Sequence, residues 1–315
     1  MTIRESTFKG MKSIVMESDE LVAMLLPGLG SKMVSLVNKS TGREFLYQTA
    51  QDTFKRPSYG DAFVDFDVSG FDEMMPTVLE CPYPDGPWKG VVLPDHGEVW
   101  TLPWDSAIGK DHVELWTYGV RLPYRFSKRL GFRNQSTLRI EYTLENLSQE
   151  DMKYIWCAHM LKACEEGTEI LLPTCVKRIM TTQRTSERLG DFGTIHPWPA
   201  SRSPSGEEVA LNRIRSREAG QCDKFHVIDP LTEGWCAIRH PDTGETLRLS
   251  FPAEKIPYLG IWISEGGLNG HFHLALEPAS GSLDRVDTAD QWNKGSTIQG
   301  KSVAEWFLDI EVISL

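Results

Sequence analysis

Residues Ser136–Asn146 read STLRIEYTLEN and alternate apolar with polar side chains along their whole length. The apolar side chains fall on every second residue from Leu138 to Leu144, and hydroxyl or charged side chains lie between them. A repeat of two residues places all apolar side chains on one face of a β-strand, whereas a helix repeats about every 3.6 residues. The segment therefore predicts a strand with one buried and one solvated face.

The segment that follows predicts a strand in a more central position. The turn Leu147–Asp151 leads into Met152–Leu161, MKYIWCAHML, which is apolar on nearly both faces. A short apolar run bounded by turn residues is typical of a strand buried inside a sheet.

Strand-like segments separated by Gly, Pro, Asn and Asp turns recur along the rest of the chain. They occupy Lys12–Glu17, Leu21–Leu26, Met33–Asn38, His112–Tyr118, Thr168–Leu172, Trp235–His240, Thr246–Phe251, Tyr258–Ile263, His271–Leu276 and Ser302–Ile313. Helical spacing is rare, and the best helix candidate is the short segment Ser69–Met75. Many short strands and few helices predict an all-β fold, a large antiparallel β-sandwich or barrel.

Two long segments, Gln48–Leu93 and Thr181–Gln221, are rich in Pro, Gly or polar residues and are expected to be functional surface loops. No repeat of fixed period and no strong boundary divides the sequence. We therefore expect residues 1–315 to form a single domain.

The composition excludes several classes of partner. The 315 residues carry a formal net charge of −11, and the basic residues are scattered. Nucleic-acid binding requires a basic patch, so no such partner is expected. The charged N-terminus does not resemble a signal peptide, and no apolar window is long enough for a membrane span. These features predict a cytoplasmic protein whose six cysteines stay reduced.

Three positions carry side chains suited to acid–base chemistry. His96 lies beside a glycine in the loop segment PDHGEVW, and His159 interrupts an apolar strand. Glu277 ends an apolar strand just before a proline, which predicts a place at the rim of a sheet. An imidazole in a cleft can titrate near neutral pH, and burial or hydrogen bonding shifts the pKa of a carboxylate. Each residue also has a structural explanation, as a hydrogen-bonded loop histidine, a core histidine or a solvated glutamate.

The strand that contains Glu277 allows a different interpretation. His271, His273 and Glu277 follow Gly270 with the spacing of a cupin metal site, and a repeat of two puts all three on one face. A cupin also needs a second, downstream motif with histidine, but no histidine follows His273. We therefore expect no metal, and a cupin-like metalloenzyme is the less favoured alternative.

The ordered set of segments resembles the galactose mutarotase (aldose 1-epimerase) superfamily, which includes a hexose-6-phosphate epimerase branch. The resemblance covers about residues 12–313, and no single motif is specific. It rests on LPGLGSKMVSL at 26–36, the His96–Gly97 pair, the strands STLRIEYTLEN and KYIWCAHML, CDKFHV at 222–227 and LEP at 276–278.

The resemblance implies a galactose mutarotase-like supersandwich and an enzyme that interconverts the α and β anomers of a free sugar without a cofactor. It implies Glu277 as the base and His159 as the acid, and it implies that His96 and Asp223 bind the sugar. Opening the ring needs a base for the anomeric hydroxyl and an acid for the ring oxygen, which we expect on opposite sides of the ring. An imidazolium is the best acid near neutral pH.

Further substrate contacts follow from the chemistry of sugars. Trp262 and Trp100 are candidates to cover the apolar C–H faces of the ring, and Asp72 and Glu73 are candidates to contact hydroxyl groups. The expected partner is a small monosaccharide. No arginine cluster marks a phosphate site, and Met160 and Leu161 replace the aromatic-rich segment typical of galactose mutarotases. A non-catalytic carbohydrate-binding or regulatory protein on the same fold is the main alternative.

Overall fold

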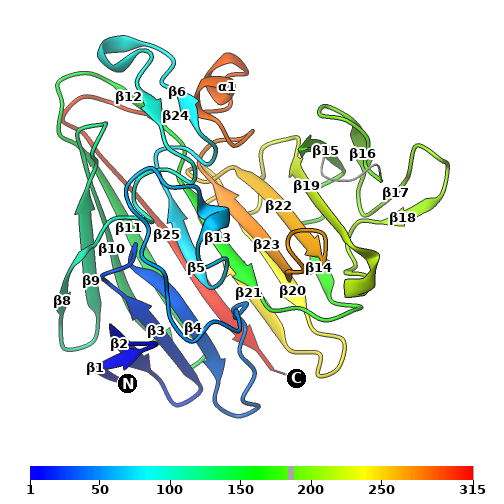
Figure 1. The fold of residues 1–315 in the computed structure, drawn as a ribbon, viewed down its shortest axis with the longest axis horizontal. Coiled ribbons are helices and arrows are strands. Elements are labelled where there is room, and N and C mark those ends of the chain that lie inside the picture. Colours follow the sequence, from blue (N-terminus) through cyan, green and yellow to red (C-terminus); the bar gives the residue numbers. More distant parts are fainter. Residues whose placement is uncertain (184–187, 315) are drawn as a thin grey trace.

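Two large sheets built from antiparallel strand pairs dominate the computed structural model, which describes residues 1–183 and 188–314. The first sheet has 11 strands, in the spatial order β1 (Thr2–Phe8), β2 (Met11–Glu17), β3 (Leu21–Leu26), β4 (Lys32–Asn38), β5 (Phe71–Met74), β13 (Cys157–Lys162), β23 (Phe272–Ala279), β22 (Tyr258–Glu265), β19 (Gln221–Val227), β15 (Arg178–Gln183) and β16 (Ile195–Pro197). Segments far apart in the chain thus lie side by side in its centre (Figure 1).

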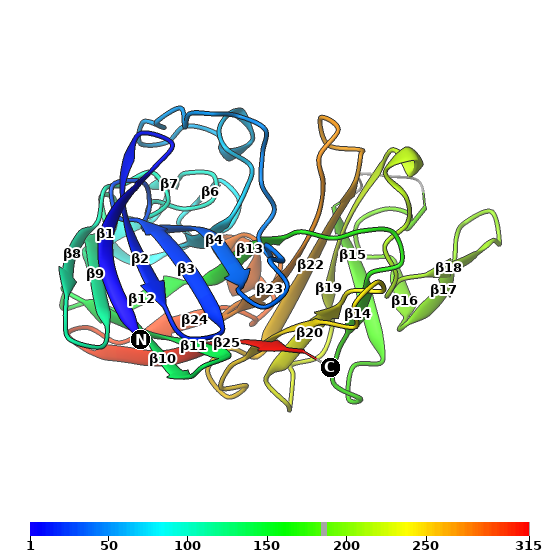
Figure 2. The same ribbon diagram turned by 90° about the horizontal axis from the view of Figure 1, so that it is seen from below.

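The second sheet has eight strands and lies under the first (Figure 2). Its spatial order is β14 (Glu169–Leu171), β20 (Trp235–Arg239), β21 (Thr246–Ser250), β25 (Val303–Ile313), β11 (Thr137–Asn146), β10 (Tyr124–Asn134), β9 (Val113–Tyr118) and β8 (Asp105–Ile108). One hydrophobic cluster, which includes Leu25 and Leu276 of the first sheet and Leu144 and Leu308 of the second, fills the space between them. The predicted all-β sandwich is confirmed.

Short elements complete the fold. Three pairs of short strands are β6 (Cys81–Pro82) with β7 (Val92–Leu93), β12 (Met152–Tyr154) with β24 (Ser296–Ile298), and β17 (Ala200–Arg202) with β18 (Glu208–Ala210). The helical elements are α1 (Val286–Gln291) and the 3-10 turns η1 (Phe63–Asp65), η2 (Gly86–Trp88) and η3 (Arg217–Ala219). Among the described residues, no helix has the length and apolar character needed to cross a bilayer.

The strand predicted from STLRIEYTLEN is β11, and its burial follows the predicted alternation. Leu138, Ile140, Tyr142 and Leu144 are buried against the first sheet, and β11 pairs with β10 and β25.

The segment MKYIWCAHML was predicted to form one strand, but the structure divides it into two. It forms β12 in a small sheet and β13 in the centre of the 11-stranded sheet. The two parts separate because the backbone between them bonds elsewhere: the N–H of Ile155 donates to the Pro76 carbonyl, and that of Trp156 to the Ser280 hydroxyl.

The helix predicted for Ser69–Met75 is wrong, because residues 71–74 form strand β5. This strand pairs with β13, and all four of its side chains are buried. Pairing inside a sheet with both faces covered outweighs the local preference of the sequence.

The two predicted loops contain short structure of their own. Gln48–Leu93 includes η1, β5, β6, η2 and β7, and Thr181–Gln221 includes β16, β17, β18 and η3. Residues 184–187 of the second segment lie outside the described residues. All six cysteines are free thiols, of which Cys175 is exposed.

Candidate active site

The register of the central strands places the two predicted acid–base residues side by side. In the pairing of β13 with β23, Cys157 lies opposite Ala279 and Leu161 lies opposite Ala275. His159 and Glu277 therefore face each other between these two pairs. Both side chains point away from the core between the sheets, because Leu276 beside Glu277, and Ala158 and Met160 beside His159, belong to that core.

The same row continues across the neighbouring strands. On one side, Asp72 of β5 lies opposite His159. On the other side, Gly260 of β22 lies opposite Glu277, and His226 of β19 lies opposite Gly260. Strands from five parts of the chain thus present one line of side chains on the outer face of the 11-stranded sheet.

His159 and Glu277, the central residues of this row, line a cavity of about 300 Å³. Most of its wall is apolar, and eight of its lining residues have acidic, basic or amide side chains. The lining residues are Phe63, Val64, Val68, Met74, Val78, Leu79, Asp95, His96, His159, Leu161, Gln183, Lys224, Trp262, Leu268, His273, Glu277 and Asp284. A largely apolar cavity with a few converging polar groups is typical of a small-molecule site.

The imidazole of His159 and the carboxylate of Glu277 are close but not hydrogen-bonded. His159 Nε2 lies 3.9 Å from Glu277 Oε1, and both residues are buried. Neither Glu277 Oε1 nor His159 Nδ1 has a hydrogen-bond partner among the described residues. A base and a proton donor are therefore available to the same small molecule.

The other oxygen of Glu277 is held by a buried lysine that the sequence analysis did not single out. Lys224 Nζ donates to Glu277 Oε2, and it also lies 3.5 Å from Asp284 Oδ1. Burial alone would lower the pKa of Lys224, but Asp284 and Glu277 outweigh burial and raise this pKa above its usual value. Lys224 thus remains an ammonium ion that fixes the orientation of Glu277.

Asp284, which was also not predicted, reaches the cavity from a loop with an unusual backbone. Leu283 and Asp284 have φ angles of 74° and 61°, in the left-handed region that non-glycine residues rarely adopt. The carbonyl of Asp284 accepts hydrogen bonds from the N–H groups of Val78 and Leu79. These bonds hold its side chain against Lys224 and against His226, whose Nε2 is 3.3 Å away.

Gly260 leaves the space that Glu277 needs. A Cβ atom at position 260 would lie 2.7 Å from Glu277 Oε2 and 3.1 Å from His226 Nε2. The missing side chain therefore lets the carboxylate of Glu277 lie over β22 and reach Lys224 on the next strand.

His96 lies at the cavity, as predicted, on a loop of restricted conformation. Its Nδ1 is 3.0 Å from Asp95 Oδ2, and its ring stacks on Phe63 with centroids 4.3 Å apart. The adjacent Gly97 has a φ of 72°, and a Cβ atom there would lie 2.2 Å from the carbonyl oxygen of Met75. Only glycine fits this position. The ring centroid of His96 lies 5.1 Å from that of His159.

The charge state of His159 differs from the expected imidazolium. Burial, with His96 and Lys224 as further causes, lowers the pKa of His159 well below its usual value. The ring is therefore neutral near pH 7 and carries a single N–H group.

Asp223 and Glu73 do not reach the cavity. Asp223 precedes Lys224 and Glu73 precedes Met74, and both of these following residues line the cavity. Consecutive residues of a strand point to opposite faces, so Asp223 and Glu73 point away from it. Asp223 instead pairs with Arg188, with 2.8 Å between Oδ2 and Nη1. Glu73 lies between the sheets, where Lys128, Tyr142 and Trp156 donate to its carboxylate.

Asp72 and the two tryptophans occupy intermediate places. Asp72 lies beside His159, but its carboxylate pairs with Lys32 at 3.0 Å rather than lining the cavity. Trp262 lines the cavity, whereas Trp100 packs behind Phe63 with ring centroids 5.2 Å apart.

The cupin-like arrangement is not formed. His271 Nδ1 lies 3.0 Å from the hydroxyl of Tyr47. The ligand atoms of His271, His273 and Glu277 do not approach within 4.8 Å of one another, a spacing that only Glu165, His240 and Asp242 meet in the described part of the chain.

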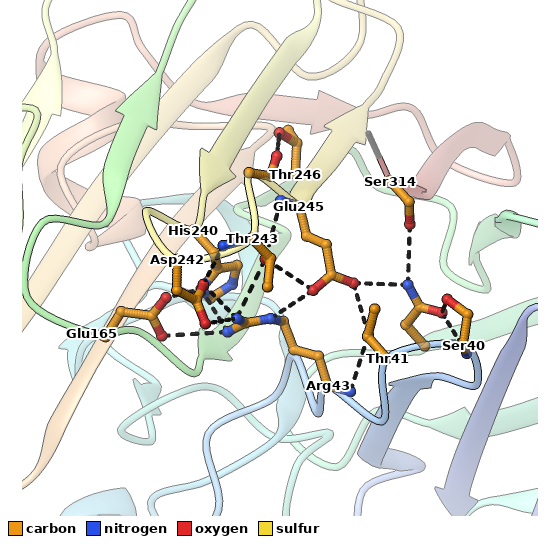
Figure 3. A network of polar contacts seen from close by, with 12 residues as sticks. Ser40, Thr41, Arg43, Glu165, His240, Asp242, Thr243, Glu245, Thr246 and Ser314 are labelled. Atoms are coloured by element: carbon orange, nitrogen blue, oxygen red, sulfur yellow. Dashed lines mark hydrogen bonds and ion pairs between the residues drawn. The ribbon is translucent and has the colours of Figure 1, made fainter.

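The group of Glu165, His240 and Asp242 surrounds an arginine rather than an open space. The guanidinium of Arg43 donates to Asp242 at 2.6 Å, to Glu165 at 3.3 Å and to Glu245 at 2.9 Å (Figure 3). A fixed positive charge there opposes a second cation. This network joins the segment after β4 to the turn between β20 and β21.

A larger hollow of about 590 Å³ on the outer face of the eight-stranded sheet is less suited to chemistry. Its wall includes the ion pair Arg129–Glu141 and also Arg125, which pairs with Glu145 outside the wall, and these side chains are about one-third to one-half exposed. Exposed and already paired charges do not make a catalytic site.

Solved structures with the same arrangement of strands include a galactose mutarotase-like protein from Clostridium acetobutylicum. It is 14% identical, with a TM-score of 0.68 over 100% of this chain and 99% of that one. The fold is galactose mutarotase-like. A galactose mutarotase related enzyme from Lactobacillus acidophilus is also 14% identical, with a TM-score of 0.67 over 96% and 97% of the two chains. No protein-family model and no curated protein matches the sequence.

A third structure of the galactose mutarotase-like fold comes from Escherichia coli K12 and is provisionally described as an aldose 1-epimerase. It is 14% identical, with a TM-score of 0.65 over 100% of this chain and 99% of that one. The likeness confirms the fold that the sequence resemblance implied. The chemistry of this chain has to be argued from its own cavity.

Proposed function

We propose that the protein is an aldose 1-epimerase that interconverts the α and β anomers of a free monosaccharide. The observation that supports this proposal is the adjacency of Glu277 Oε1 and His159 Nε2 in a buried cavity. The two sugar oxygens that exchange protons, the anomeric hydroxyl and the ring oxygen, are bonded to the same carbon. Acid and base therefore need to be neighbours and need not lie on opposite sides of the ring.

Ring opening begins when Glu277 Oε1 accepts the proton of the anomeric hydroxyl. The electron pair of that O–H bond forms the carbonyl bond as the bond between the anomeric carbon and the ring oxygen breaks. His159, with its proton on Nε2, gives that proton to the departing ring oxygen. A neutral histidine can act in this way when it is held against the developing charge.

Ring opening leaves Glu277 protonated and His159 without its Nε2 proton. Rotation about the bond next to the carbonyl carbon then presents the other face of the carbonyl. As the free hydroxyl attacks this face and returns its proton to His159 Nε2, Glu277 returns its proton to the carbonyl oxygen, so the other anomer forms and both residues regain their starting state. His96 and Trp262 are proposed to orient the ring, the first by hydrogen bonding and the second by covering a C–H face.

The test is whether the purified protein accelerates anomer exchange. Fresh α-anomers of hexoses, pentoses and 6-deoxy sugars are followed by polarimetry and exchange NMR, and the activity must coelute with the protein on two different columns. Acceleration above the buffer rate for at least one sugar supports the proposal. Sugar binding in a calorimeter without acceleration would instead identify a carbohydrate-binding protein.

We expect kcat/KM for the best sugar to stay level between about pH 6.5 and pH 8. The pKa of His159 lies well below 6.5, and that of Lys224 lies above its usual value, so neither changes charge in this range. An imidazolium acid would instead lose about tenfold in rate per pH unit above its pKa. A tenfold decline per unit, after subtraction of the buffer rate, would contradict a neutral His159.

Substitution of Gly260 by alanine is expected to lower kcat about 100-fold although it changes no reacting group. The added Cβ at 2.7 Å forces the Glu277 carboxylate to move, and a shift of about 1 Å is enough for such a loss. The matched control is Gly131→Ala in β10, where the nearest heavy atom to a Cβ is 3.4 Å away. Wild-type kcat in Gly260→Ala would show that the position of Glu277 does not matter.

A further inference from the structure

The cavity extends beyond Glu277 and His159 to a second buried histidine on the same strand. His273 precedes Glu277 by two strand repeats, so both side chains project from the same face of β23. Between them lies the buried Ala275, which packs in one hydrophobic cluster with Phe63 and Leu161 of the cavity wall. Trp262 lies opposite Ala275 and forms the adjacent wall.

The imidazole of His273 is fully buried yet has no hydrogen-bond partner on either nitrogen among the described residues. Buried polar groups are nearly always hydrogen-bonded, because leaving one unpaired destabilises the folded protein. The nearest rings, those of Tyr47 and His271, have centroids 5.0 and 6.1 Å away. The neighbouring Ser264 does not hydrogen-bond to the ring of His273, because its hydroxyl donates to the carbonyl of His271.

The ring of His273 is neutral. Burial, assisted by the nearby His271, lowers the pKa of His273 to about 3. A neutral imidazole offers one donor and one acceptor, which matches a sugar hydroxyl that also donates and accepts. A phosphate or carboxylate can only accept here, and the cavity's buried ammonium ion, Lys224, is already held by two carboxylates.

We propose that His273 binds a hydroxyl group on the edge of the sugar remote from the anomeric carbon, and that this contact makes the site specific for neutral sugars. The inference rests on the proposed function for the orientation of the sugar, with its anomeric carbon at Glu277. It does not rest on turnover, because His273 acts in binding.

The experiment compares dissociation constants, measured by calorimetry, for the best-bound hexose and its 2-, 3-, 4- and 6-deoxy analogues. In the wild type, we expect one analogue that lacks a remote hydroxyl to bind about 10–100-fold more weakly than the parent, because His273 is left unpaired. In His273→Ala, the parent and that analogue should bind equally. His273→Gln, which keeps a donor and an acceptor, should restore part of the difference.

The matched control is His271→Ala, two residues away and outside the cavity lining, which should leave the ratio of the two dissociation constants unchanged. The 6-phosphate and the uronate of the same hexose should bind no tighter than the parent. An unchanged ratio in His273→Ala, or tighter binding of either anion, would overturn the inference. If that variant does not fold, His273→Gln and the wild-type series decide.

The two proposals fail separately. If no sugar shows accelerated anomer exchange but the ratio collapses in His273→Ala, the epimerase proposal fails and the His273 contact stands. If exchange is fast and no analogue depends on His273, the contact fails and the epimerase proposal stands.

Discussion

Replacement of Glu277 by glutamine is expected to slow anomer exchange by about 10²–10⁴-fold, the usual loss when a positioned general base is removed. The amide has nearly the same shape, but it cannot take a proton from the anomeric hydroxyl. Lys224 keeps Asp284 as a partner, 3.5 Å away, so the variant should remain folded. Exchange NMR at saturating sugar gives kcat directly.

A matched control for this variant is Glu265→Gln. Glu265 is also buried in the 11-stranded sheet and ion-paired, with Arg215 Nε 2.9 Å from its Oε2, but it does not line the cavity. It should retain near wild-type kcat. Equal losses in both variants would mean that general damage to the sheet, rather than a missing base, explains the effect of Glu277→Gln.

Replacement of Lys224 by methionine is expected to destabilise the protein by about 3–5 kcal/mol, as found when one member of a buried ion pair is removed. The substitution leaves the carboxylates of Glu277 and Asp284 buried without their shared cation, at side-chain exposures of 1% and 7%. Urea unfolding followed by tryptophan fluorescence measures the change.

The double variant Lys224→Met with Glu277→Gln should recover part of this loss. It removes the buried carboxylate of Glu277, which would otherwise lack a cation, and Asp284 keeps His226 as a partner, with Nε2 3.3 Å away. The double-mutant cycle isolates the interaction between Lys224 and Glu277. Ordinary surface substitutions change the free energy of unfolding over a spread of about 1 kcal/mol. If Lys224→Met lowers this free energy by less than that, or if the losses of the two single variants simply add, the lysine does not hold the carboxylate as described.

The fold was predictable because apolar and polar residues alternate in the strands that have one solvent-exposed face, and β11 is the clearest case. Central strands lose this signal since both faces are buried. The segment at β5 therefore suggested a helix, and its residues Asp72 and Glu73 were both expected to contact hydroxyl groups of the sugar. In a strand they must separate: Asp72 lies beside His159, and Glu73 lies between the sheets.

The missed residues show the same limit in the site. Asp223 and Lys224 are adjacent, and only the register of β19 decides that the lysine faces Glu277. A lysine in the mostly apolar stretch Cys222–Val227 is a signal that could have been used, because a buried lysine needs a carboxylate partner. Asp284 left no such signal, since its position depends on two left-handed residues in a loop.

The row of side chains from β5 to β19 has a consequence for how the cavity comes into being. Its members are adjacent in space but come from chain positions between 72 and 277, and the pairings of β5 with β13 and of β13 with β23 each close a long loop. Loop closure of this kind is slow relative to hairpin formation. During refolding, sugar binding should therefore appear only after β-structure has formed. A polypeptide that ends before β22 would contain every histidine up to His240, but we expect it to bind no sugar.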